Sequence, residues 1–292
     1  MLFRSHIYSE HVSNQINYEP FYVPLLSSLR RLAISKMEAP NEIMISIDEN
    51  GIAQPKKKKV TTVASVAYTT MREMLVYLTH IDKNDMLKAL IEKINEIKNS
   101  NDIDQNSINS LCWAIGSLSG VLPDEEEQGF ITHVLEYLIS LCRETADINM
   151  RAIIACGIMY ICSQFGRLLA KHWELLKAIL LKLFEFMREQ NPAVQDSAVD
   201  SLKTVCKHCR SEIIKKQMNE ETSFLEQMVS NIQDIFAPLS LDNIIEALES
   251  LVVLIQCVGD QQRKDYTVKV CAELNSKLEY LCSNPQLVNL ER

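Results

Sequence analysis

The 292-residue chain is long enough for two average domains or for one elongated array, and its 47% of apolar residues exclude a disordered protein. Its 7 Gly and 8 Pro are few for this length, which favours long helices over a turn-rich β fold. The 30 Lys and Arg and the 38 Asp and Glu give a net charge of -8 without a dominant sign. General affinity for nucleic acid or for an anionic membrane is therefore not expected.

The cysteine pattern and the N-terminus predict a soluble, intracellular protein. Nine Cys are scattered without disulfide-like spacing, which indicates a reducing compartment, the cytosol or the nucleus. Residues 1–5 lack the apolar core of a signal peptide. The longest apolar run, residues 152–162, is too short to span a bilayer, so we expect no membrane insertion.

One passage near the N-terminus has a β-like pattern. Isoleucines alternate with other residues over 43–47, and Asn50-Gly51 suits a tight turn. We expect a two-stranded hairpin near residues 43–58, inserted between helices as part of a hairpin and basic loop at 41–60. The lysines of that loop resemble a nuclear-import signal, although a solvated strand edge is the commoner reason for such a run.

Helical patterns fill the rest of the chain, which predicts an all-α protein. Paired segments recur about every 40 to 47 residues, the period of HEAT and armadillo arrays. Asn191-Pro192 resembles the start of a HEAT second helix, with a capping residue and then Pro at the first helical position. About six pairs fit into a single HEAT-repeat solenoid spanning 1–292. The helical segments are expected at 21–37, 70–79, 85–95, 107–122, 130–142, 150–165, 170–190, 192–209, 224–236 and 243–258.

Two of these helices carry more apolar surface than a packed helix needs. In the helix at 130–142, one stripe accounts for the core, and a second lies about 100° around the axis. The helix near 173–187 repeats this arrangement, with Lys182 bordering its second stripe. The acidic run that begins at Asp124 is expected to cap and open the first of these helices. The second stripes consist of Leu135, Ile139 and Cys142 in one helix and of Leu175, Ile179 and Phe186 in the other.

If the two helices lie side by side, their second stripes would face each other and form a groove for an amphipathic peptide helix. The two repeats concerned span residues 124–187. A helix packed between two neighbours in a layered all-α protein shows an equally wide apolar face. Periodicity alone therefore leaves a structural HEAT scaffold without an open groove as the alternative, and favours it.

Catalytic, metal and cofactor chemistry is not expected. The glycines form no phosphate-binding loop. Cys206-Lys-His-Cys209 is the only Cys-x-x-Cys motif, and its two cysteines are too few to hold a structural zinc. Cys142 lies near Arg143 and Arg151, and such a cationic setting would help a partly exposed thiol to ionise. The nearest His in sequence, His133, lies on the opposite side of the same helix. We therefore expect a protein that is not an enzyme and needs no cofactor.

Several ungapped segments resemble the exportin-1 family of nuclear export receptors, within the importin-β superfamily. The most specific is residues 111–120, LCWAIGSLSG. Further similarity extends upstream to residues 31–37 and downstream to about residue 258. The other matching segments are 71–73 (MRE), 75–80 (LVYLTH), 152–155 (AIIA), 158–161 (IMYI), 172–173 (HW), 182–187 (KLFEFM) and 194–196 (VQD).

The resemblance implies that the groove binds leucine-rich nuclear export signals of cargo proteins. Its floor and end would be Ala155, Met159, Leu168 and His172, and Arg151 and Lys182 would attract acidic residues of the signal. It also implies that Cys142 is the thiol that leptomycin-type inhibitors alkylate. The groove lining would be Leu135, Ile139, Cys142, Leu175, Ile179, Lys182 and Phe186.

The resemblance also implies a receptor that shuttles between nucleus and cytoplasm, with cargo, Ran-GTP and nucleoporins as partners. This chain matches only the middle of such a receptor, without the arch that grips Ran-GTP, so Ran binding is expected only in a longer receptor. Glu174 and Ile148 stand where the family has Lys, which thins the basic rim. Leu168 and Leu175 replace Phe, which would widen the pocket.

Overall fold

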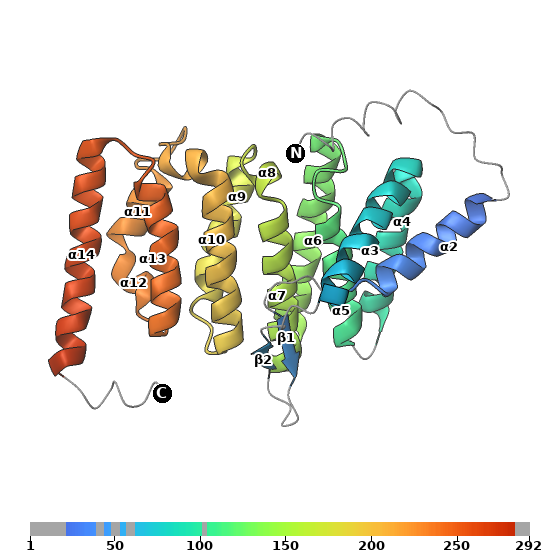
Figure 1. The fold of residues 1–292 in the computed structure, drawn as a ribbon, viewed down its shortest axis with the longest axis horizontal. Helices are drawn as coiled ribbons and strands as arrows, with labels where there is room; N and C mark the ends of the chain where they lie inside the picture. Colours follow the sequence, from blue (N-terminus) through green and yellow to red (C-terminus); the bar gives the residue numbers. More distant parts are fainter. Residues whose placement is uncertain (1–21, 39–43, 48–52, 57–61, 101–103, 284–292) are drawn as a thin grey trace.

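The computed structural model describes residues 22–38, 44–47, 53–56, 62–100 and 104–283 as an elongated array of helices, with α2 at one end and α14 at the other (Figure 1). None of the described helices has the length and apolarity of a membrane span. The elements are α2 (Tyr22–Ser35), β1 (Met44–Ile47), β2 (Ala53–Lys56), α3 (Thr62–Ile81), α4 (Lys83–Asn99), α5 (Gln105–Ser117), α6 (Asp124–Glu144), α7 (Ile148–Gln164), α8 (Gly166–Leu169), α9 (Trp173–Phe186), α10 (Pro192–Ile214), α11 (Phe224–Ser230), α12 (Ile232–Phe236), α13 (Leu241–Ile255) and α14 (Asp260–Ser283).

The helices form two rows, as the sequence period predicts. We call α2, α4, α6, α9, α11, α12 and α14 the first row, and α3, α5, α7, α10 and α13 the second row. Consecutive helices of the second row pack closely on one another from α3 to α13. Five helix pairs followed by α14 make up the described residues, where the sequence predicts about six pairs. This layering is that of the expected all-α, HEAT-like solenoid.

Side-chain caps fix where six of the described helices begin. Asp82, for example, accepts a hydrogen bond from the Asp85 amide at 3.0 Å, and Asn191 accepts from the amides that follow Pro192. The expected cap at Asp124 is wrong, because Pro123 holds the cap position and Asp124 is the first residue of α6. The side-chain caps are Asp82, Asp104, Asp147, Asn191, Ser223 and Ser240.

Two glycines set the close approach of α5 and α7 in the second row. A Cβ on Gly116 would lie 2.4 Å from a ring carbon of Tyr160, and a Cβ on Gly157 would lie 2.6 Å from Sγ of Cys112. Neither distance is sterically tolerable. The absence of a side chain at these positions therefore determines how near the two backbones come.

The described strands β1 and β2 pair antiparallel, with Met44 opposite Lys56 and Ile47 opposite Ala53. This ladder lies against the second-row helices α7 and α10. The expected turn at Asn50-Gly51 and the lysines at 57–59 lie outside the described residues.

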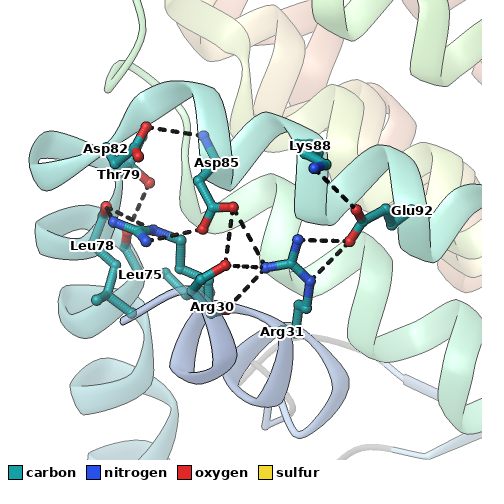
Figure 2. A network of polar contacts seen from close by, with 10 residues as sticks. Arg30, Arg31, Leu75, Leu78, Thr79, Asp82, Asp85, Lys88 and Glu92 are labelled. Carbon is teal, nitrogen blue, oxygen red and sulfur yellow. Dashed lines mark hydrogen bonds and ion pairs between the residues drawn. The ribbon is translucent and has the colours of Figure 1, made fainter. Parts of the chain in front are cut away.

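A buried arginine joins the first three described helices (Figure 2). Arg30 of α2 is 1% exposed, and its Nε and Nη2 donate to the carbonyl of Leu78 near the end of α3, at 3.1 and 2.9 Å. Its Nη1 donates to Asp85 of α4 at 3.0 Å. The guanidinium thus satisfies a carbonyl of the last turn of α3 and neutralises a carboxylate in the first turn of α4.

Asp85 is held by several donors at once. Ser27 donates to it at 3.0 Å, and Arg31 approaches it at 3.5 Å. Burial by itself raises the pKa of Asp85, but the hydrogen bond from Ser27 and the charges of Arg31 and Arg30 outweigh burial and lower that pKa below its usual range. The ionised carboxylate is therefore the form that the fold stabilises.

Replacing Arg30 with Met should destabilise α2 and its contacts with α3 and α4 by about 2–4 kcal/mol, because the Leu78 carbonyl loses its donor and Asp85 its buried partner. Arg31→Met is the matched control and should cost about 1 kcal/mol or less, since Arg31 is about a third exposed. Hydrogen exchange should show faster opening confined to residues 22–100 in Arg30→Met. Equal effects of the two substitutions would contradict this account.

The pH dependence of the same region should have a defined sign. Because the folded-state pKa of Asp85 is lowered, its contribution to stability is complete above its ordinary pKa of 3.8 and is lost as the pH falls towards the lower folded-state value. Asp85→Asn should remove this part of the acid sensitivity. The check is the pH at which residues 22–100 lose protection from exchange in the two proteins.

Candidate functional site

The two second stripes lie on α6 and α9, consecutive helices of the first row. Both helices rest on α7 and α8, which lie beneath them. The backbones of α6 and α9 approach each other less closely than those of consecutive second-row helices. We call the contact between their second stripes the seam, formed by Leu135, Ile139 and Cys142 of α6 and by Leu175, Ile179, Lys182 and Phe186 of α9.

The electrostatics of Cys142 place the C-terminal half of α9 near the end of α6. Lys182 of α9 and Arg151 of α7 both lower the pKa of the Cys142 thiol, while Glu189 and Glu185 raise it. The thiol also donates to the Arg151 carbonyl at 3.6 Å. The structure therefore brings Cys142 near Lys182, which lies 40 positions later in the sequence.

The seam is closed in this structure. Leu135 is 5% exposed and Ile179 is 6% exposed, and Cys142 and Phe186 are also buried. Ile139, Leu175 and Lys182 are half-buried. Four of the seven seam residues are thus covered by the protein's own atoms, which is how the structural alternative explains a second apolar stripe.

The expected floor of the groove lies under this seam. Ala155 and Met159 of α7 and Leu168 of α8 are buried, and Arg151 is half-buried. His172 precedes α9, and its buried Nε2 has no hydrogen-bond partner among the described residues. The buried hydroxyl of Tyr137 on α6 likewise has no hydrogen-bond partner among the described residues.

Lys182 occupies one face of the Phe186 ring. Its Nζ lies 5.0 Å from the ring centroid and 2.8 Å from a carboxylate oxygen of Glu185. The cation is thus shared between a ring face and a carboxylate on its own helix. Any ligand that packs on this face of Phe186 has to displace it.

The expectation that Cys142 ionises readily is wrong for this conformation. Burial raises the pKa of its thiol above the ordinary 9.0, and the charges of Lys182 and Arg151 reverse only part of this effect. Cys257, Cys271 and Cys282 are exposed, so Cys142 is not the most accessible thiol.

Two polar contacts at the N-terminal end of the seam were not foreseen from the sequence. Asp124 at the start of α6 pairs with Lys171, just before α9, and links the two helices. Glu127 is buried and accepts a hydrogen bond from the Gly120 amide at 2.5 Å. Burial raises the pKa of Glu127, against the opposing effects of that hydrogen bond and of Arg167. Asp124 lies 11 positions before Leu135, so the same helical spacing could have placed it on the seam.

Two residues expected at the edge of the groove, Glu174 and Ile148, are exposed, and the two cysteines of the Cys-x-x-Cys motif are buried. Glu174 is exposed in the first turn of α9, and Ile148 is 63% exposed at the start of α7. Cys206 and Cys209 are buried on α10. Within the described ranges, no group of three or more His, Cys, Asp or Glu side chains could hold a metal ion.

Comparison with known families identifies the array. A family model described as CRM1 / Exportin repeat 2 matches residues 19–86, and one described as CRM1 / Exportin repeat 3 matches residues 99–147, which include α6. Protein EXPORTIN 1A of Arabidopsis thaliana is 36% identical over 253 residues, which are 86% of this chain and 23% of that protein.

Two further relatives give the same result. Exportin-1 of Drosophila melanogaster is 33% identical over 258 residues, 88% of this chain and 24% of that protein. Exportin-1 of Schizosaccharomyces pombe is 36% identical over 212 residues, 72% of this chain and 20% of that protein. The chain spans about a quarter of the length of these relatives. It therefore belongs to the exportin-1 family, of which it represents one HEAT-like segment.

Proposed function

We propose that this chain acts as a segment of a nuclear export receptor and binds leucine-rich export signals of cargo proteins in the seam between α6 and α9. The observation that supports the proposal is the pair of apolar stripes on α6 and α9, two helices of an exportin-1-type array that share the floor of α7 and α8. An amphipathic peptide helix with three to five apolar anchors has a matching shape. Coupling to Ran-GTP, contact with nucleoporins and shuttling between nucleus and cytoplasm belong to the same proposal, in a longer receptor.

Binding requires α6 and α9 to separate, because the seam residues are buried. The second row holds its helices together by close backbone approach, whereas the backbones of α6 and α9 come less close to each other. Each buried Leu or Phe anchor of a peptide contributes about 1.5–3 kcal/mol, so several anchors can offset the exposure of the stripes during opening.

The charges around the seam would orient the peptide. Lys182 and Arg151 lie at the Cys142 end and would attract acidic residues of a signal. At the opposite end of α9, the exposed Glu174 adds a negative charge. An acidic residue of the peptide is therefore favoured beside Cys142 and disfavoured beside Glu174.

The second candidate is a structural HEAT segment whose seam never opens. The burial of Leu135 and Ile179 favours it, because a closed seam needs no ligand to cover its apolar side chains. The two candidates differ in whether an apolar peptide competes with the contact between the stripes. Direct binding distinguishes them.

A fluorescent leucine-rich peptide should bind the chain, and Ile139→Asp should weaken binding about 30-fold or more, the equivalent of about 2 kcal/mol, because a carboxylate would enter an apolar contact. Leu181→Asp is the matched control, since Leu181 lies on α9 but is 54% exposed, and it should leave affinity unchanged. Fluorescence anisotropy measures both, with thermal melting to show that each variant is folded. Equal affinity in all three proteins would reject the seam as the binding site.

Thiol labelling should distinguish an opening seam from a sealed one. Iodoacetamide, a small electrophile without affinity for the seam, should modify Cys257, Cys271 and Cys282 before Cys142, because burial both covers the Cys142 thiol and raises its pKa. An α,β-unsaturated lactone with a long apolar tail should reverse this order, because the tail would occupy the seam beside Cys142. Peptide mass spectrometry gives the order.

Lys182→Met should slow the lactone reaction at Cys142, since it removes the first of the two charges that favour the thiolate. The same order of labelling with both reagents would show that the seam does not admit an apolar ligand.

A further inference from the structure

The start of α6 is tied to its surroundings by polar contacts. Three carboxylates in the first turn of this helix each contact a different segment of the chain. These contacts join the start of α6 to the residues before α9, to the start of α4 and to the loop that precedes α6. They are the ion pair of Asp124 with Lys171, the ion pair of Glu126 with Lys83 and the hydrogen bond that Glu127 accepts from the Gly120 amide.

Helix α8 strengthens the link between α6 and α9 at the same end of the seam. It packs against both helices. The hydrogen bond from Lys171, followed by the charges of Lys171 and of Arg167 in α8, lowers the pKa of the Asp124 carboxyl below its usual range. The N-terminal end of the seam is therefore held by an ion pair, by α8 and by the contacts of α6 to α4 and to its own loop.

The Cys142 end of the seam is held much less firmly. The Cys142 thiol donates to the Arg151 carbonyl of α7 at 3.6 Å, and a thiol is a weak donor. Lys182 of α9 pairs with Glu185 on its own helix and not with a residue of α6. In the part of the chain that the structure describes, no hydrogen bond or ion pair joins α6 to α9 at this end.

Helix α9 is fixed along its length by elements other than α6. The Trp173 ring meets the Phe224 ring of α11 edge-on, with centroids 6.2 Å apart, and Phe184 stacks on the same ring at 6.1 Å. Trp173 and Phe184 lie on the side of α9 opposite the seam. At the end of α9, Gln195 of α10 donates to the Met187 carbonyl at 3.2 Å. Of the two helices of the seam, α6 is therefore the one that can move at the Cys142 end.

We propose that α6 pivots on its first turn, so that the seam opens at the Cys142 end and a peptide enters there. The identity of the ligand as a leucine-rich peptide rests on the proposed function. The pivot itself follows from the unequal contacts at the two ends of α6, and it leaves the three carboxylate contacts of the first turn in place.

The length of α6 sets the size of the opening. At about 1.5 Å per residue, Cys142 lies about 27 Å along the helix axis from Asp124. A tilt of about 10° about the first turn therefore moves Cys142 by about 5 Å and Leu135 by about 3 Å. The residues nearest the end of α6 are uncovered first, so the first apolar anchor of an entering peptide meets Cys142 and Ile139 before Leu135.

Pulsed electron–electron double resonance between two spin labels can measure the width of the seam at each end of the whole chain. Cys257, Cys271 and Cys282 are first replaced by Ser, because their exposed thiols would also take up the label, whereas Cys142 is buried. The label sites are all exposed, so circular dichroism should show unchanged helix content. The two pairs are Glu125→Cys with Glu174→Cys at the N-terminal end and Arg143→Cys with Glu189→Cys at the Cys142 end.

Without peptide, the pair at the N-terminal end should give one narrow distance distribution, and the pair at the Cys142 end a broader one that extends about 5 Å further. Lys171→Met should broaden the distribution at the N-terminal end, because it removes the ion pair between Asp124 and the start of α9. Lys182→Met is the matched control. Its partner Glu185 lies on the same helix, so it should leave the N-terminal distribution narrow.

Equal widths at the two ends without peptide, or a greater width at the N-terminal end, would overturn the pivot. Adding a leucine-rich peptide should lengthen the distance at the Cys142 end and leave the other unchanged. A peptide that binds by fluorescence anisotropy without this change would overturn the pivot and leave the proposed function standing. A peptide that fails to bind, while the Cys142 end still gives the broader distribution, would reject the proposed function and support the pivot.

Discussion

Each helix of this array is covered by its immediate neighbours, because an extended solenoid has no distant element that folds back over it. This constraint decides how every apolar stripe is buried. In the second row the coverage is close, and Gly116 and Gly157 remove the side chains that would otherwise hold α5 and α7 apart. In the first row, α6 and α9 both pack on α7 and α8, and their backbones come less close to each other.

The closed seam combines two features that usually exclude each other. Its apolar residues are buried as in a core, yet polar groups lie along it: Lys182 on the Phe186 ring, Arg151 beside Cys142, and the pair of Asp124 with Lys171. A core that served stability alone would gain little from such groups, since partly exposed ion pairs contribute about 0–1 kcal/mol. Polar groups along an apolar contact are instead suited to a boundary between two helices that separate and rejoin.

The array and the two apolar stripes could be predicted from the sequence because both depend on periodicity. The spacing of Leu135, Ile139 and Cys142 identifies a face of a helix whatever the helix packs against. Whether that face is open depends on the distance between α6 and α9, for which the sequence carries no local signal. The ionisation of Cys142 was misjudged for this reason: the adjacent cations are visible in the sequence, whereas the burial that raises its pKa is not.

The Arg30 network shows a second limit of sequence reasoning. Arg30 and Asp85 are 55 positions apart, and a charged residue within an amphipathic pattern is expected on the solvent side. Arg30 can be buried because the end of α3 places the Leu78 carbonyl beside its guanidinium (Figure 2). The sequence gives no local signal for this contact. The contact between Lys182 and the Phe186 ring, by contrast, can be predicted from the sequence, because the two residues are four positions apart on one helix.

The glycines between α5 and α7 have a consequence for the shape of the molecule. Where one row of a solenoid is spaced more tightly than the other, the array bends towards the tighter row. Gly116 and Gly157 keep the spacing small on the second-row side, and a methyl group at either position would act as a wedge. Such a wedge would straighten the superhelix locally and change the angle at which the first-row helices diverge. Two missing side chains on one side of the array thus help to set its curvature.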